Sequence, residues 1–108
     1  MYLLLLLSNK MKNVLEKYLK KAINLKAEYL EIEYKDNHEE ITAIQGSFGV
    51  GIGRIKSSSL DGKTLLKQLH EISKKKIQIN DDGRNYEISA KIYDSFGEET
   101  FKLKIRHI

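Results

Sequence analysis

The sequence predicts a single α+β domain, a two-layer sandwich in which two helices cover one face of a largely antiparallel sheet, in the order α-β-β-β-α-β-β-β. Three observations lead to this prediction. Two segments, residues 12–25 and 61–75, repeat apolar residues with the spacing of a helix. The remaining segments alternate apolar and polar residues, as strands do. Short turns join these strands, and strands on short turns pair antiparallel.

Composition narrows the class of protein. The 108 residues suit one domain with one core, which we place at residues 12–108. No cysteine is present, which excludes disulfides and thiolate metal sites and favours a reducing, cytoplasmic location. The net charge of +4 combines 19 basic with 15 acidic residues, whereas nucleic-acid binders more often carry a patch of one sign.

The N-terminus carries an apolar run at residues 3–7. It is too short to span a membrane, because a spanning helix needs about 20 apolar residues. The basic region and the cleavage site of a signal peptide are also missing. Two interpretations of residues 1–11 stay open. In the first, these residues are an extension that forms the start of the first helix. In the second, Met11 is the native start, and the ten residues before it result from a wrongly assigned start codon.

Periodicity also predicts the first helix and the first hairpin. Residues 12–25 form an amphipathic helix, because their apolar residues follow i, i+3, i+4, i+7 spacing. Residues 28–35 alternate in polarity and predict a strand. Asp and Asn favour a turn at residues 36–38, because their side chains bond their own backbone there. Residues 39–45 then return as the second strand.

The next segment, residues 46–54, is unusual because glycine alternates with apolar residues. The alternating residues are Phe48, Gly49, Val50, Gly51, Ile52 and Gly53. In a strand, this pattern would put the apolar side chains on one face and bare backbone on the other. Interior glycine marks the close approach of another element or of a ligand. We favour a helix or a bulge packed tightly at this strand, and the alternative is a binding groove.

A second helix follows the glycine strand. Residues 57–60 predict a loop, and Asp61 is expected to cap a helix over residues 61–75. The segment at residues 57–64 ends in Gly-Lys-Thr and superficially matches a phosphate-binding loop. However, such a loop needs glycine where Ser57 stands, and the chain after it is too short to complete that fold. We therefore expect an ordinary capped helix start.

The last quarter of the chain predicts three more strands. Residues 77–79 form a short strand, and the Asp-Gly pair within residues 80–83 favours a turn. Two alternating runs, residues 86–92 and 101–105, flank a second turn at residues 94–98. The C-terminus is therefore expected to be a finished hairpin.

No constellation of catalytic residues emerges from the sequence. His38, His70 and His107 lack a neighbour at metal-ligand spacing, so we expect no metal site. Glu31 and Glu33 would share a strand face, as paired catalytic carboxylates can. Because lysines lie nearby in the sequence, we interpret the pair as part of a solvated, charged strand face. No local motif brings Ser, His and Asp together as a triad. We expect no catalytic residue and no cofactor, and hence a protein that is not an enzyme.

Several segments resemble a known family. Residues 22–33 read AINLKAEYLEIE and are similar to the A-I-x-x-G-A-S-D-I-H-I-E-P segment of type II secretion and type IV pilus assembly ATPases. Residues 44–46 (IQG) fall where that family has R-I-D-G. Residues 83–88 (GRNYEI) with residues 95–98 (SFGE) resemble its G-R-x-V-D-V-R-V…S-Y-G-E hairpin. Over about residues 12–108, the resemblance implies the second N-terminal domain, a small α+β unit that precedes the motor.

The departures from the family pattern carry their own implication. The family's Ser-Asp and His positions hold Glu28, Tyr29 and Glu31 here. Thr42 and Ser89 stand where the family has arginines that reach the nucleotide. The motor domain, with its P-loop and zinc-binding cysteines, has no counterpart in these residues. The resemblance therefore implies a stand-alone relative without ATPase activity.

We expect a cytoplasmic protein-interaction module that pairs with a secretion or pilus ATPase, or with itself through sheet edges. The candidate interaction face joins the strand glycines to the last turn: Gly49, Gly51, Gly53, Ser95, Phe96 and Gly97. One alternative is a small-ligand-binding domain that uses the glycine strand. Another, less favoured, is a weak nucleic-acid binder that uses two groups of lysines: Lys17, Lys20, Lys21, Lys74, Lys75 and Lys76.

Overall fold

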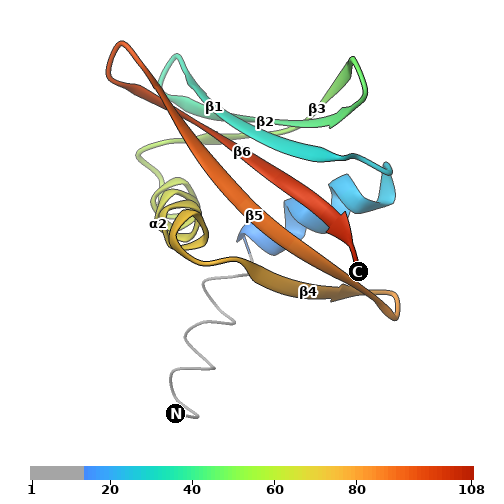
Figure 1. Ribbon diagram of the computed structural model, residues 1–108. Helices are drawn as coiled ribbons and strands as arrows, with labels where there is room; N and C mark the ends of the chain where they lie inside the picture. Colours follow the sequence, from blue (N-terminus) through green and yellow to red (C-terminus); the bar gives the residue numbers. More distant parts are fainter. Residues whose placement is uncertain (1–13) are drawn as a thin grey trace, which may run out of the picture.

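The computed structural model describes residues 14–108 (Figure 1). The expected order α-β-β-β-α-β-β-β is confirmed, with the first helix over residues 14–24 of the described chain. The other elements are β1 (Tyr29–Lys35), β2 (His38–Gln45), β3 (Phe48–Lys56), α2 (Leu60–Lys74), β4 (Ile77–Asp81), β5 (Arg84–Ser95) and β6 (Glu98–His107). The interpretations of residues 1–11 lie outside the described residues. Within these, no helix is both long and apolar enough to cross a membrane.

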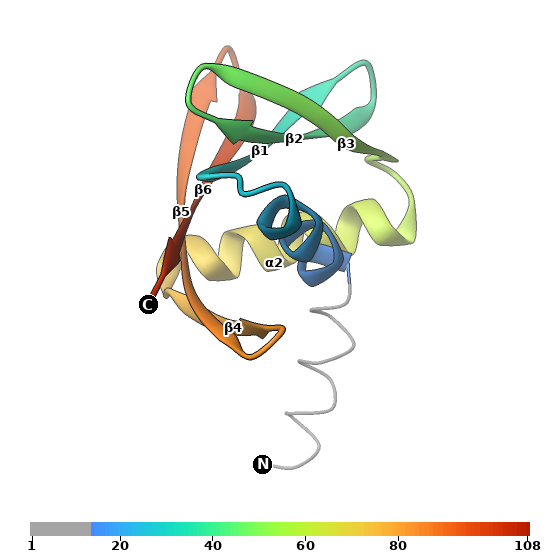
Figure 2. The same ribbon diagram turned by 90° about the vertical axis from the view of Figure 1, so that its right-hand side faces the viewer.

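The six strands form one sheet in the order β3-β2-β1-β6-β5-β4, and every neighbouring pair is antiparallel. Two three-stranded meanders therefore meet where β1 pairs with β6, with Leu30 opposite Leu103. Figure 2 shows the sheet curving around the first helix and α2, which both lie on its concave side. The convex side carries no helix of the described chain.

The core lies between the two helices and the concave face. It forms because alternate residues of each strand point to the same side. Among its fully buried side chains are Leu15, Leu19, Leu30, Ile32, Ile41, Leu65, Leu69, Ile88, Phe101 and Leu103. The residues between them on the strands, such as Glu31 and Lys102, must face the convex side. The sheet therefore has one apolar face, packed on helices, and one polar face.

Helix α2 begins earlier than the sequence suggested. Its N-cap is Ser59, whose Oγ accepts a hydrogen bond from the Gly62 N–H at 3.0 Å. The prediction of Asp61 as the cap was therefore wrong, and Asp61 lies in the first turn of the helix instead. Ser59 takes the role because its extended backbone (ψ 164°) aims the hydroxyl at the free N–H groups of that turn. Lys75, expected as the last residue, is the C-cap.

The glycine of the Gly-Lys-Thr sequence, Gly62, is required by the packing of the chain and not by phosphate binding. A Cβ at this position would lie 2.8 Å from the carbonyl oxygen of Ser57 and closer still to that of Lys56. Because backbone atoms cannot yield, the tight turn from β3 into α2 requires glycine here. Gly62, Lys63 and Thr64 all lie inside the helix, as the interpretation of an ordinary capped helix start expected.

The hairpin turns are tighter than expected. Asp36 and Asn37 alone join β1 to β2, both with positive φ, and His38 already belongs to β2. Asp82 and Gly83 form a similar turn between β4 and β5. Positive φ at both central residues matches the right-handed twist of the strands, and Asp, Asn and Gly tolerate it best. The strands consequently extend beyond the predicted runs, and β3 ends at Lys56.

Candidate functional site

The glycine strand β3 does not keep all its glycines on one face. Its pairing with β2 shifts register, so that Ile41 lies opposite Gly53 whereas the next residue, Thr42, lies opposite Gly51. Ile52 is thus an extra residue, and the strand bulges there. Gly49 and Gly51 face the same side as Thr42, which is the convex side, and Gly53 faces the helices. The simple alternation that the sequence suggested is interrupted by this bulge.

Gly53 lies beneath the first helix. A Cβ there would be 3.0 Å from Tyr18 Cζ and 3.1 Å from its hydroxyl oxygen, and nearer still to Cε1. Tyr18 is buried, and its ring occupies the space that a side chain at Gly53 would need. This is the tight helix packing that we favoured from the sequence, and it removes Gly53 from any exposed face.

Gly49 and Gly51 lie on an open rim of the sheet. Among the described residues only β2 borders β3, which is therefore an edge strand. Nothing lies within 4 Å of a Cβ placed on Gly51. Phe48 and Val50, on the concave side, are 78% and 53% exposed, and no charged residue stands between Phe48 and Gly51. We call this stretch, residues 48–51, the β3 rim.

The backbone of the β3 rim is available for pairing. In an antiparallel ladder, pairs that exchange two hydrogen bonds alternate with pairs whose N–H and C=O groups point outward. A two-residue turn separates Gln45 from Phe48, and we infer that these residues form the first hydrogen-bonded pair. Gly49 and Gly51 therefore direct their N–H and C=O groups away from β2. No side chain on these residues hinders an approaching strand.

The β5–β6 turn is the second part of the expected face. Phe96 and Gly97 both have positive φ, at 54° and 80°, and Phe96 is fully exposed. The Asp94 carboxylate accepts a hydrogen bond from the Gly97 N–H at 3.1 Å, which fixes the turn. A bulky residue in the left-handed region is a conformational outlier, and such outliers concentrate at functional positions.

The structure does not bring the two parts together. Ser95 pairs with Glu98 at the end of the sheet where Lys35 and His38 also pair. Phe48, by contrast, follows the β2–β3 turn at the other end, where β1 begins. Figure 1 shows the two hairpin tips on opposite sides of the sheet. They are two separate surfaces rather than one face.

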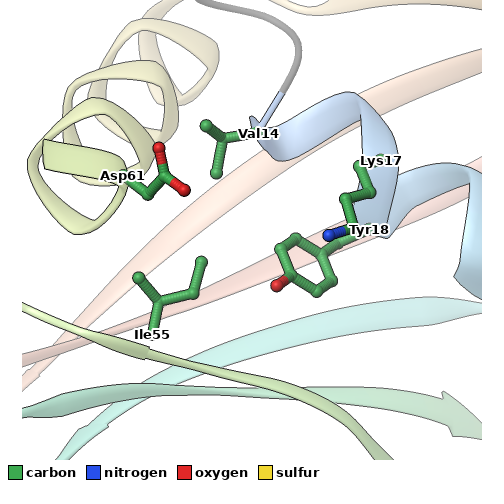
Figure 3. Close-up of a pocket in the computed structure, with 5 residues that line it drawn as sticks. All are labelled: Val14, Lys17, Tyr18, Ile55 and Asp61. Atoms are coloured by element: carbon green, nitrogen blue, oxygen red, sulfur yellow. The ribbon is translucent and has the colours of Figure 1, made fainter. Parts of the chain in front are cut away.

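A cavity of about 260 Å³ lies where the first helix, β3 and α2 meet. Figure 3 shows its lining: the Tyr18 ring lies beside Ile55, and the Asp61 carboxylate points toward Val14. Lys17 completes the lining from the first helix. The cavity adjoins the packed Gly53–Tyr18 contact, so it is the hollow nearest to the predicted glycine groove. Its polar groups are the Lys17 ammonium, the Asp61 carboxylate and the Tyr18 hydroxyl.

The histidines and the buried acid have local partners. His70 Nε2 is 3.1 Å from Glu99 Oε1, and the His70 ring contacts the Phe101 ring edge-on. His107 stacks on Tyr86 at the far end of the sheet. Glu39 is buried and accepts a hydrogen bond from the Ser57 hydroxyl. In residues 14–108, no three His, Asp or Glu side chains are grouped as metal ligands would be.

One group of residues was missed by the sequence reasoning. A shallow hollow of about 300 Å³ on the convex face is lined by Lys76, Glu87, Ser89, Lys104 and Arg106. The alternation of Lys102, Lys104 and Arg106 along the last strand could have signalled a basic face. The register that adds Lys91 of β5 to this face, opposite Lys102, was not visible in the sequence.

Comparison with known proteins leaves the family open, since no family model matches the chain and no curated protein is significantly similar to it.

Proposed function

We propose that the chain is a non-enzymatic protein-interaction module that binds by pairing a strand of its partner with the β3 rim. The exposure of Phe48 and Val50 on the uncharged part of an edge strand carries this proposal. An added strand would satisfy the outward N–H and C=O groups of the rim and cover both apolar side chains. Pairing of this kind is a common mode of peptide and subunit recognition.

The two edges of the sheet differ in a way that supports the proposal. Proteins protect their free edges with short strands and charged residues. At the opposite edge, β4 has five residues, ends at Asp81 and is followed by Asp82. The β3 rim, residues 48–51, has neither form of protection, and the bulge at Ile52 and the charge of Arg54 both lie beyond it. A partner strand would therefore pair more readily with the β3 rim than with β4.

The partner that we favour is a second copy of the chain, because antiparallel β3–β3 pairing would cover the rim of both molecules at once. The resemblance to the N-terminal domain of secretion and pilus ATPases suggests such an ATPase as another partner for the same rim. Both partners suit a cytoplasmic protein. In either case the binding energy would come from backbone pairing and from burial of Phe48 and Val50.

Sedimentation equilibrium tests the proposal directly. We expect a concentration-dependent dimer that a Val50→Lys substitution converts to monomer, because a charge on an edge strand opposes pairing. Leu60→Lys is the matched control, since Leu60 is 80% exposed at the start of α2 and away from the rim. A chain that stays monomeric, and that also fails to bind a purified secretion or pilus ATPase, contradicts the proposal.

The alternative function, binding of a small ligand, has the cavity beside Tyr18 in its favour. Its volume of about 260 Å³ lies just under the range of about 300–1,000 Å³ that is usual for ligand pockets. A thermal-shift screen with nucleotides and metabolites tests it. A ligand at 100 times its Kd would add about 2.7 kcal/mol to the free energy of unfolding. No shift with any compound argues against this alternative.

A further inference from the structure

The convex face carries a band of cations on β5 and β6. Lys102, Lys104 and Arg106 alternate along β6 with the core residues Phe101 and Leu103, and must therefore point away from the helices.

The register adds a fourth cation. Lys91 on β5 lies directly opposite Lys102, and Ser89 lies opposite Lys104. We call Lys91, Lys102, Lys104 and Arg106 the basic band. These residues differ from the helix lysines that the sequence suggested for nucleic-acid binding.

Acidic residues border the band at two points, since Glu31 lies opposite Lys102 on β1 and Glu87 lies opposite Arg106 on β5. Arg106 pairs with Glu87 at 3.2 Å, and Lys76 reaches the same carboxylate at 3.6 Å. Within residues 14–108, none of the band lysines at 91, 102 and 104 makes an ion pair within 4.0 Å. Lys102 instead lies over the Tyr29 ring, 4.5 Å from its centroid.

The cross-strand pair of Lys91 and Lys102 also has a cost, because like charges directly opposite each other destabilise a sheet. A bound anion would remove the repulsion and gain the attraction of both cations.

The shape of the band indicates an extended ligand. Residues two apart on a strand are separated by roughly 6.7 Å, so the band from Lys102 to Arg106 is roughly 13 Å long. This exceeds the size of a single phosphate group. The face is convex, and its hollow beside Lys104 is partly lined by the acidic Glu87. A flexible chain of negative charges can follow such a curved surface, whereas a flat membrane would touch only its crest.

Two tyrosines accompany the band. Tyr93 follows Lys91 on the same face of β5, opposite Thr100, and is 51% exposed. Tyr29 lies on β1 opposite Lys104. Tyr29 is half-buried beneath Lys102, whereas Tyr93 is free to provide a stacking surface for an unpaired base. We infer that the basic band binds single-stranded nucleic acid, with the phosphates on the cations and a base against Tyr93. This function is separate from the β3 rim.

Fluorescence anisotropy with a labelled oligothymidylate of about 12 nucleotides tests the inference. We expect binding whose affinity falls between about 50 and 200 mM salt, with a log–log slope of about −2 for three phosphate contacts on a single strand. The triple variant Lys91→Gln, Lys102→Gln, Lys104→Gln should lose about tenfold or more in affinity. Its melting temperature should stay close to that of the parent, because the loss of the repulsion between Lys91 and Lys102 offsets the loss of the Lys102–Tyr29 contact.

The matched control removes the same charge from the first helix through Lys17→Gln, Lys20→Gln and Lys21→Gln, and should retain the affinity. Tyr93→Leu should weaken binding without changing the salt slope, because it removes stacking and not charge.

Three results would overturn the inference. One is an absence of binding at low salt. The second is an equal loss in both triple variants, which would indicate unspecific attraction. The third is binding to phosphatidylserine vesicles but not to the oligonucleotide.

Discussion

The Tyr18 ring lies directly over the backbone of Gly53, at the position that a Cβ would occupy. This contact fixes the first helix against β3, since Tyr18 is buried and belongs to the core. It also gives a structural reason for glycine at the bulge. Gly51, two residues away, has no such neighbour.

Gly53→Ala should therefore destabilise the fold by about 1–3 kcal/mol, the usual cost of adding a methyl group to a packed site. Gly51→Ala is the matched control and should stabilise by about 0.5–1 kcal/mol, because interior glycine weakens a strand. Urea denaturation of both variants measures the difference. Equal effects at the two positions would show that Tyr18 moves aside freely.

Glu39 and Ser57 form a second testable pair. Glu39 is buried, and the Ser57 hydroxyl donates a hydrogen bond to its carboxylate. Ser57→Ala leaves the carboxylate without this donor and should cost about 1–3 kcal/mol of stability. The exposed neighbour Ser58 provides the control, since Ser58→Ala removes a hydroxyl that makes no such contact.

A double variant sharpens this test. Adding Glu39→Met to Ser57→Ala removes both polar partners, and replacement of both by apolar groups can be nearly neutral. The double variant should therefore recover most of the stability that the single variant loses. If the double variant loses as much stability as Ser57→Ala and Glu39→Met lose separately when added together, the pairing of Glu39 with Ser57 is contradicted.

The C-terminus of the first helix offers a stabilising substitution. Lys26 has φ 59°, its N–H bonds the Ile23 carbonyl, and the Ala27 N–H bonds the Ala22 carbonyl. This is the Schellman motif, in which glycine normally occupies the left-handed position. Lys26→Gly should raise the free energy of unfolding by about 1 kcal/mol, because the strain on a Cβ disappears.

Thermal or urea denaturation checks this gain. Lys20→Gly, inside the same helix, is the counter-test and should lower stability by about 1 kcal/mol. If both substitutions destabilise, the strain at Lys26 is negligible.

The fold could be predicted because its apolar residues follow the helical spacing and the strand alternation regularly. The alternation through Leu30 and Ile32, and again through Phe101 and Leu103, identifies the strands and their buried face. Short turns then enforce antiparallel neighbours. The pairing of β1 with β6 could not be derived in this way, because contact between distant strands depends on packing and leaves no local signal.

The candidate site was less predictable for two physical reasons. A bulge of one residue at Ile52 reverses the face of Gly53, and the alternating glycines are compatible with a bulge without fixing its position. The cap of α2 was also misplaced, because Ser59 and Asp61 are both good N-cap residues and only the close approach of Gly62 selects Ser59. The basic band depends in the same way on register, which alone places Lys91 opposite Lys102.

Phe96 provides the last prediction. Its backbone is in the left-handed region at the tip of the β5–β6 hairpin, and its side chain contributes no burial to the fold. Phe96→Asn should therefore increase stability by about 1 kcal/mol, because asparagine adopts this conformation at a lower cost than phenylalanine. Gly97→Ala, with φ 80° at the neighbouring position, should do the opposite. Urea denaturation of the two variants measures both effects. A loss of stability in Phe96→Asn would mean that the aromatic ring supports the fold. The expected gain would mean that the ring contributes nothing to the stability of the monomer and is available for a contact with another molecule.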